Sequence, residues 1–312
     1  MNEGMQSSWG EVEAVVGKHS AGTRVGIGMP IYNGEKYLEQ TLRAHQAQTY
    51  DDFSVVITDN ASSDRTRELC LDYCASDARF SYLRYPVNVG APQNFVRSFQ
   101  RASGEFFRWA NADDLPEPGL LEACLDALDK NPDVVLAYGK TRLIDAEGAV
   151  IRNYEDNLDL RQPQPSDRFR ACFEQAQLVN IIYGLIRRAP LAKTRLIAPY
   201  QGSDVNLIAE LSLYGKFFEL GKYLFQRRLH PAASTWDGDA ETQRLFWKPF
   251  SQKLLMRSWQ SLYEHQRAVL RAPIPFAEKR KLLAFLTRVA WWKRHHMRRD
   301  LITLVRFSVL KR

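Results

Sequence analysis

Short apolar segments, rich in β-branched and aromatic residues, alternate with longer segments of helical periodicity through the first half of the chain. The pattern predicts strands over 25–31, 53–58, 80–85, 106–110 and 133–138. It predicts helices over 37–48, 65–75, 92–102 and 119–130. Strands that alternate with helices are typical of an α/β fold whose central sheet is mostly parallel and flanked by helices on both faces, as in Rossmann-like proteins.

Polar loops follow each of the first four predicted strands. In parallel sheets ligands bind beyond the carboxyl ends of the strands, so these loops are expected to form one site. Neither G-x-G-x-x-G nor G-x-x-x-x-G-K occurs in the sequence, which argues against a dinucleotide fingerprint and a P-loop. Carboxylates and amides instead suit a site that reads a nucleobase and holds its diphosphate through a metal ion. The loops carry Pro30, Asn33, Asp59, Asn60, Asn88, Gly90, Asp113 and Asp114.

The fourth loop is the one around which the chain is organised. The aromatic run 106–110 leads to Asp113 and Asp114, and Pro116 then stops the strand. Mg²⁺ and Mn²⁺ usually take one or two protein carboxylates and complete their coordination with phosphate oxygens and water. Adjacent acids before a proline are also ordinary turn and helix-capping chemistry, and the residues of this loop alone leave both interpretations open.

Four motifs in order resemble those of the family 2 glycosyltransferases with the GT-A fold. The resemblance extends over about residues 24–240. It implies a metal-dependent, inverting enzyme that transfers a sugar from a nucleoside diphosphate, most often UDP. The motifs are Met29-Pro30-Ile31-Tyr32-Asn33-Gly34, Asp59-Asn60-Ala61-Ser62-Ser63-Asp64-Arg65-Thr66, Asn88-Val89-Gly90, and the stretch from Trp109 to Asp114.

The resemblance also implies roles for single residues in binding the nucleotide sugar and the metal. Asp59 and Asn60 would lie at the nucleobase, where the family usually has two acids, and Asn60 can still accept a uracil N–H. Asn111 stands where many members have an acid; Asp114 is the first choice for the metal ligand, and Asp113 would hold hydroxyls of the donor. The remaining residues of the expected nucleotide-sugar site are Pro30, Tyr32, Asn33, Asn88 and Gly90.

Two later segments are expected to complete the site. Asp204 follows a Gly-Ser turn at the start of an apolar helix, where an N-cap role is the simple alternative. The resemblance makes Asp204 the general base that deprotonates the acceptor hydroxyl. It also places Arg228 and His230 near the diphosphate, with Arg228 neutralising charge and His230 serving as a second metal ligand or a donor to phosphate.

Basic residues concentrate at the end of the chain. The net charge is +7, yet 279–312 contains eleven Lys and Arg and a single acid, Asp300. Trp and Leu residues alternate with these cations in a helical pattern. Two alternatives stay open: a helical appendage that packs on the catalytic domain or on a second subunit as a homodimer, or an amphipathic surface that rests on anionic lipid. Without a recognised RNA or DNA module, a nucleic-acid partner is not expected.

The predicted organisation is a flexible leader over 1–23, a GT-A domain over 24–240 and a basic helical region over 241–312. Within the domain, 24–140 would bind the nucleotide sugar and 141–240 the acceptor, a glycan, lipid-linked or small-molecule hydroxyl. A polar start and the lack of a long apolar run predict a cytoplasmic protein, peripheral to the membrane in the lipid alternative. Mn²⁺ or Mg²⁺ is the expected cofactor. The rival hypotheses are a non-catalytic binding module and a sugar nucleotidyltransferase.

Overall fold

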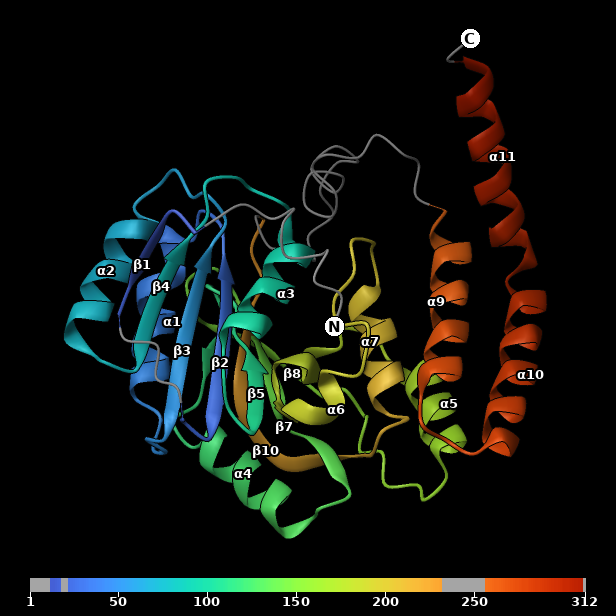
Figure 1. Cartoon of the computed structure of the whole chain (residues 1–312), viewed down its shortest axis with the longest axis horizontal. Coiled ribbons are helices and arrows are strands. Elements are labelled where there is room, and N and C mark those ends of the chain that lie inside the picture. Colours follow the sequence, from blue (N-terminus) through green and yellow to red (C-terminus); the bar gives the residue numbers. More distant parts are fainter. Residues whose placement is uncertain (1–11, 18–21, 232–255, 311–312) are drawn as a thin grey trace.

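The computed structural model describes residues 12–17, 22–231 and 256–310. Its centre is a ten-stranded mixed sheet in the order β1-β4-β3-β2-β5-β9-β7-β10-β6, with β8 paired to β7 (Figure 1). The strands are β1 Ala14–Val16, β2 Val25–Ile31, β3 Phe53–Asp59, β4 Phe80–Arg84, β5 Phe106–Trp109, β6 Leu115–Pro116, β7 Val134–Ile144, β8 Val150–Tyr154, β9 Leu185–Arg187 and β10 Lys216–Arg228.

Helices cover both faces of this sheet, as the alternating pattern predicts. They are α1 Glu35–Gln46, α2 Thr66–Ser76, α3 Ala91–Arg101, α4 Leu120–Lys130, α5 Pro165–Gln175, the 3₁₀ helix η2 Asn180–Tyr183, α6 Arg188–Leu191, α7 Ser203–Leu211, α9 Arg257–Arg271, α10 Phe276–Trp292 and α11 Arg294–Leu310. All five strands predicted in the first half of the chain are present, so the α/β expectation is confirmed.

The sheet consists of two parallel parts that are joined by one antiparallel strand. Strands β4, β3, β2 and β5 are parallel neighbours, and β7 pairs in parallel with β10. Between them lies β9, which pairs antiparallel with β5 on one side and with β7 on the other. The predicted boundary at 140 between the nucleotide half and the acceptor half lies within β7, and the roles of the two halves stay predictions.

The beginning of the chain contains a strand that the sequence analysis missed. Within the predicted flexible leader, β1 adds antiparallel to β4, with Val15 opposite Leu83. The Glu13 carboxylate lies 3.4 Å from the Arg84 guanidinium, which holds the added strand in place. An edge strand has unpaired backbone groups, so even a three-residue partner gains hydrogen bonds. The β-branched residues Val12, Val15 and Val16 were the available signal.

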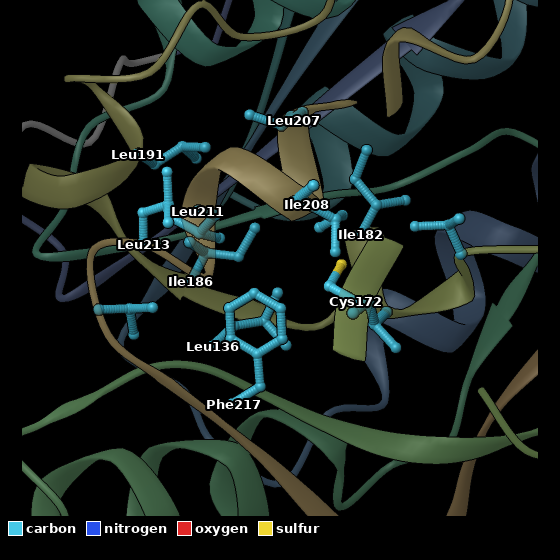
Figure 2. Close-up of a cluster of buried hydrophobic side chains, with 14 of the residues drawn as sticks. Leu136, Cys172, Ile182, Ile186, Leu191, Leu207, Ile208, Leu211, Leu213 and Phe217 are labelled. Carbon is cyan, nitrogen blue, oxygen red and sulfur yellow. The ribbon is translucent and has the colours of Figure 1, made fainter. Parts of the chain in front are cut away.

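An apolar core in the acceptor half anchors α7, the helix that begins at Ser203. Leu207, Ile208 and Leu211 of α7 are buried against side chains from the sheet and from α5 (Figure 2). This burial fixes the start of α7 relative to the sheet, because interiors pack too tightly to let a helix slide. The surrounding residues in the cluster are Leu136, Cys172, Ile182, Ile186, Leu191, Leu213 and Phe217.

The C-terminal helices form an appendage on the acceptor half, as one of the two alternatives predicts. Helices α9 and α10 lie beside each other and contact α7 and α5, while α11 projects beyond the body (Figure 1). The predicted boundary at 240 and the helical pattern from Thr242 to Leu255 lie outside the described residues. None of the described helices has the length and apolar character needed to cross a bilayer.

Candidate active site

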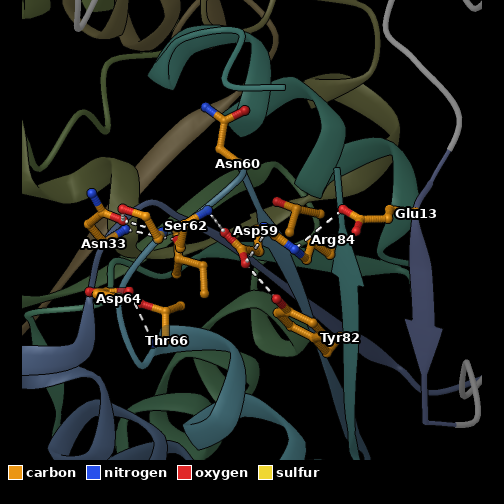
Figure 3. Close-up of polar contacts among 12 residues, drawn as sticks. Glu13, Asn33, Asp59, Asn60, Ser62, Asp64, Thr66, Tyr82 and Arg84 are labelled. Atoms are coloured by element: carbon orange, nitrogen blue, oxygen red, sulfur yellow. Dashed lines mark hydrogen bonds and ion pairs between the residues drawn. The ribbon is translucent and has the colours of Figure 1, made fainter. Parts of the chain in front are cut away.

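The loops after β2 and β3 are hydrogen-bonded to each other. Asn33 adopts a left-handed conformation, with φ of 49°, which asparagine tolerates better than most residues. Its N–H donates to Ser62 Oγ and its Oδ1 accepts the Ser63 N–H, both at 2.9 Å (Figure 3). Asn33 therefore shapes the loop. Half-buried Pro30 precedes it, and Tyr32 is 51% exposed, which leaves an aromatic ring available at the loop surface.

Asp59 ends β3 with a fully buried carboxylate. Its Oδ1 accepts the Ser62 N–H at 2.9 Å. Its Oδ2 accepts the Tyr82 hydroxyl and lies 3.6 Å from Arg84 Nη1 (Figure 3). Both oxygens are thus engaged within the protein. The contact between Asp59 and a nucleobase stays a prediction, and it would have to share or replace one of these bonds.

Asn60 links the second loop to the third. Its Nδ2 donates to Asn88 Oδ1 at 2.7 Å, and its Oδ1 accepts the Val89 N–H at 3.1 Å. Asn88 Oδ1 also accepts the Gly90 N–H at 2.8 Å, and Gly90 has φ of 88°, in the region that favours glycine. An aspartate at 60 could not donate to Asn88. The amide at this position therefore has a structural reason independent of base recognition.

The two carboxylates of the acidic loop, Asp113 and Asp114, differ in burial. Asp114 is 3% exposed, and its oxygens accept the Asn111 amide and the Arg228 N–H, both at 2.9 Å. Burial and the neighbouring charge of Asp113 raise the pKa of Asp114 above its usual range. A carboxylate so enclosed is a poor first ligand for a metal. The role of Asp114 as metal ligand stays a prediction. The contacts explain Asn111, because its amide supplies a hydrogen bond that an ionised acid could not.

Asp113 is the accessible acid of the pair. Its side chain is 24% exposed, and its Oδ2 lies 2.9 Å from His230 Nε2. The His230 ring packs against Tyr37 with ring centroids 4.8 Å apart, which orients the imidazole. The two atoms lie within hydrogen-bonding distance of each other, and the carboxylate oxygen is the kind of ligand that Mg²⁺ and Mn²⁺ prefer. The described residues contain no cluster of three or more His, Cys, Asp or Glu that could hold a metal ion.

Arg228 holds the acidic loop rather than pointing at a ligand. Its Nε donates to the Asp113 carbonyl at 3.1 Å, and its Nη1 donates to the carbonyls of Asp145 and Ala146 at 3.2 and 3.0 Å. Its Nη2 donates to Gln40 Oε1 at 2.9 Å. The side chain is 2% exposed. The predicted neutralisation of phosphate could act only through its field, because its donors are engaged with protein acceptors.

A buried polar chain behind the acidic loop was missed from the sequence. Thr41 Oγ1 donates to the carbonyls of Ala112 and Asp114 at 3.0 and 3.1 Å. His45 Nδ1 donates to the Thr41 carbonyl at 2.8 Å, so its Nε2 accepts from Arg108 Nη1 at 2.9 Å. Burial and the Arg108 charge lower the pKa of His45 to about 3, which keeps the imidazole neutral. An arginine inside an apolar strand was the signal that could have revealed this chain.

Asp204 lies in the first turn of α7. Gly202 precedes the helix with φ of 83°, and Asp204 Oδ1 accepts the Val205 N–H at 2.9 Å. Burial raises the pKa of Asp204, and the charge of Arg227 lowers it. A carboxylate at a helix start with a raised pKa can accept a proton from a hydroxyl near neutral pH. The geometry agrees with the predicted base without testing it.

Comparison with known proteins identifies the family of this fold and site. The model for glycosyl transferase family 2 matches residues 27–189. An uncharacterised glycosyltransferase of Rickettsia conorii is 31% identical over 134 residues, 42% of this chain and 21% of the relative. Chondroitin synthase of Escherichia coli is 29% identical over 210 residues, 66% of this chain and 29% of that protein. The chain therefore spans less than a third of either relative.

A solved structure shows the same fold. Residues 1–349 of S. aureus TarS, in complex with UDP-GlcNAc, superpose with a TM-score of 0.63 and 15% identity, covering 90% of this chain and 80% of that one. The likeness at this identity concerns the fold, which is GT-A.

Proposed function

Because the chain belongs to glycosyl transferase family 2, we propose that it transfers a sugar from a UDP-sugar, with Mn²⁺ or Mg²⁺ and with inversion, to a hydroxyl group of a glycan, lipid-linked or small-molecule acceptor. The observation that carries the metal-dependent part is the pair of Asp113 Oδ2 and His230 Nε2, 2.9 Å apart at the end of the parallel strands. Asp113 takes the role that the sequence suggested for Asp114.

The residues divide the chemistry between them. Asp204 takes the proton from the acceptor hydroxyl while the oxygen of that hydroxyl attacks the anomeric carbon of the donor sugar. The nucleoside diphosphate leaves from the opposite face in the same displacement. Asp113 and His230 would hold the divalent ion, which offsets the charge that grows on the leaving diphosphate. Asn111 and Arg228 keep Asp114 in place beneath them.

UDP is the proposed donor nucleotide. TarS, which shares the fold, is bound to UDP-GlcNAc in the solved structure. Loops built from Asn33, Asp59, Asn60 and Asn88 would surround the base, and the exposed Tyr32 ring offers a stacking surface. A glycan acceptor is supported by the similarity to chondroitin synthase.

The C-terminal helices are the proposed contact with a membrane that holds a lipid-linked acceptor. Trp291 and Trp292 at the end of α10 are 67% and 64% exposed, and Lys293 and Arg294 follow them. Indole rings beside cations favour the interface of an anionic bilayer. A cytoplasmic enzyme peripheral to the inner membrane face accords with this surface. A homodimer through the same helices remains the competing proposal.

Thermal unfolding with nucleoside diphosphates, each with and without Mn²⁺, tests the donor site. We expect UDP with Mn²⁺ to stabilise the protein by about 2.7 kcal/mol at a hundredfold excess over its Kd. Asp113→Ala should abolish the part that depends on Mn²⁺, while Asp126→Ala, an exposed acid on α4, should leave it unchanged.

The same assay separates the alternatives. If Asp114→Asn removes the response to Mn²⁺ and Asp113→Ala does not, the ligand is Asp114, as the sequence first suggested. UDP binding without any release of UDP from UDP-sugars would favour the non-catalytic module. A preference for a nucleoside triphosphate would favour the nucleotidyltransferase.

A further inference from the structure

Two consecutive arginines near the end of β10 reach opposite faces of the sheet. Arg228 faces α1, where its guanidinium lies 4.5 Å from the Tyr37 ring centre and bonds Gln40. Arg227, the preceding residue, reaches η2 instead. Successive strand residues alternate in direction, so the tandem places one cation on each side. The donor half uses Arg228, which leaves the purpose of Arg227 open.

Arg227 is 8% exposed and binds a short segment of the acceptor half. Its Nη1 donates to the Leu178 carbonyl at 3.1 Å and to Asn180 Oδ1. Asn180 in turn donates its backbone N–H to Asp156 Oδ1 at 2.9 Å. A single guanidinium thus joins β10 to η2, and through η2 to the loop that carries Asp156.

The same residue lies next to the acidic loop. Strand β10 pairs antiparallel with β6, which follows Asp114 directly, and the Arg228 N–H beside Arg227 donates to Asp114. Burial raises the pKa of Asp114, Asp156 and Asp204, and the positive charge of Arg227 lowers it in each case. Its field therefore reaches both the donor loop and the start of α7.

Other charges near α7 are compensated locally. On α9, Glu264 lies 3.4 Å from Arg195, and burial holds the pKa of His265 at about 4, so that ring is neutral. Glu210, further along α7, pairs with Arg271 of α9. On α5, Arg168 donates to the Ser212 carbonyl beyond the end of α7. The phenol of Tyr200 lies near Asp204 but is neutral, because burial raises its pKa.

We propose that Arg227 is a positioning residue: it fixes η2 and the Asp156 loop of the acceptor half against β10, the strand that carries Arg228, and its charge acts on the acceptor half, in which Asp204 lies. The inference rests on the proposed function where it concerns the base. Its geometric part, the link between β10 and η2, does not. Arginine is required because its planar guanidinium donates to both the Leu178 carbonyl and Asn180 Oδ1. A lysine would supply the charge but not the same pair of hydrogen bonds.

Hydrogen exchange measured by mass spectrometry tests the link without any substrate. We expect Arg227→Met to speed exchange of the amides over Val179–Tyr183 by about tenfold or more, because hydrogen bonds to a charged donor are lost. Arg227→Lys should give a smaller increase. Arg187→Met is the matched control, since Arg187 also donates to two carbonyls, those of Val134 and Leu128. Unchanged exchange in Arg227→Met, or an equal rise in the control, overturns the link.

The pH dependence of UDP release from UDP-GlcNAc, with water as acceptor, tests the charge. Removing the cation leaves the pKa of Asp204 higher, so the acid limb of the rate should move to higher pH in Arg227→Met. It should stay near its original position in Arg227→Lys and Arg187→Met. An acid limb that does not move in Arg227→Met overturns this part. Release absent from every protein overturns the proposed function instead, while the exchange result stands.

Discussion

Asn111 Nδ2 donates to Asp114 Oδ2 at 2.9 Å, so the residue that replaces a common family acid holds the acid three positions later. The amide compensates a carboxylate that is 3% exposed. The amide at position 111, where many family members have an acid, therefore has a structural reason: it stabilises the buried carboxylate of Asp114.

Asn111→Asp should destabilise the fold. The new carboxylate cannot donate when ionised, and it adds a like charge beside a buried acid, so we expect a loss of about 1–3 kcal/mol at pH 8. Urea unfolding at pH 8 measures this. Asn131→Asp at the end of α4 is the control, because it also loses one donated bond, to Ala127, but lies away from acids of the loop. Equal stability of the Asn111→Asp protein and the original would contradict our account.

Asp204→Asn should remove turnover and keep the donor site. Loss of a general base typically costs about 10²–10⁴ in rate. UDP affinity in the presence of Mn²⁺ should stay within about twofold, since no described contact joins Asp204 to the Asp113 and His230 pair. The control Asp167→Asn changes an acid in the first turn of α5 and should be active. Full activity of Asp204→Asn would exclude it as the base.

Glu278→Gln should loosen the appendage. Glu278, in the first turn of α10, accepts the Ser166 N–H of α5 at 3.0 Å and pairs with Lys281. These donors lower the pKa of Glu278 to about 2. An acid whose folded pKa is depressed stabilises the fold above its unfolded pKa, and this is lost as pH falls from about 4.5 towards 2. Urea unfolding should show about 1–3 kcal/mol lost at pH 7, with a smaller difference at pH 3.

Membrane contact should depend on the tryptophan pair of α10. We expect the protein to sediment with vesicles that contain phosphatidylglycerol at low salt and to be released by about 0.5 M NaCl, because screening weakens the attraction. Alanine at both Trp291 and Trp292 should reduce binding severalfold. Phe276→Ala is the control: this ring is 75% exposed at the other end of α10. Binding that ignores both the tryptophans and salt would favour the dimer alternative.

Periodicity predicted the elements of the nucleotide half because each strand and helix there shows its own local pattern. The first predicted strand, within 25–34, is present as β2 Val25–Ile31, and the loop predicted to follow it begins at Tyr32. Strand β9 has only three residues, which are too few to show a periodic pattern. It forms because it pairs with β5 on one side and with β7 on the other. The first part of the long strand β10 does not alternate regularly between buried and exposed positions, so the sequence there has little strand periodicity.

Loop order predicted which loops meet, and the loops after β2, β3 and β4 are hydrogen-bonded to one another. The roles of their residues stay predictions. The different burial of Asp113 and Asp114 could not be predicted from two adjacent acids in the sequence. The buried polar chain of Thr41, His45 and Arg108 was not predicted, because its contacts join residues that are far apart in the sequence. His45 and Arg108 are 63 positions apart. The sequence also does not show that Arg227 and Arg228 differ in their contacts. They do so because successive residues of a strand point to opposite faces of the sheet.

The pairing of Asp113 with His230 spans 117 positions of the chain. During synthesis, the loops that follow β2, β3 and β4 can therefore form before His230, the partner of Asp113, has been made. Strand β9 has the same effect, because β5 cannot pair with it on its second edge until Arg187, the partner of Phe106, has been synthesised. Contacts between distant segments form late and slowly. A nascent chain that ends before β10 is thus expected to have the loops after β2, β3 and β4 but not the contact between Asp113 and His230, so the metal site that we propose can form only after the last of the described strands.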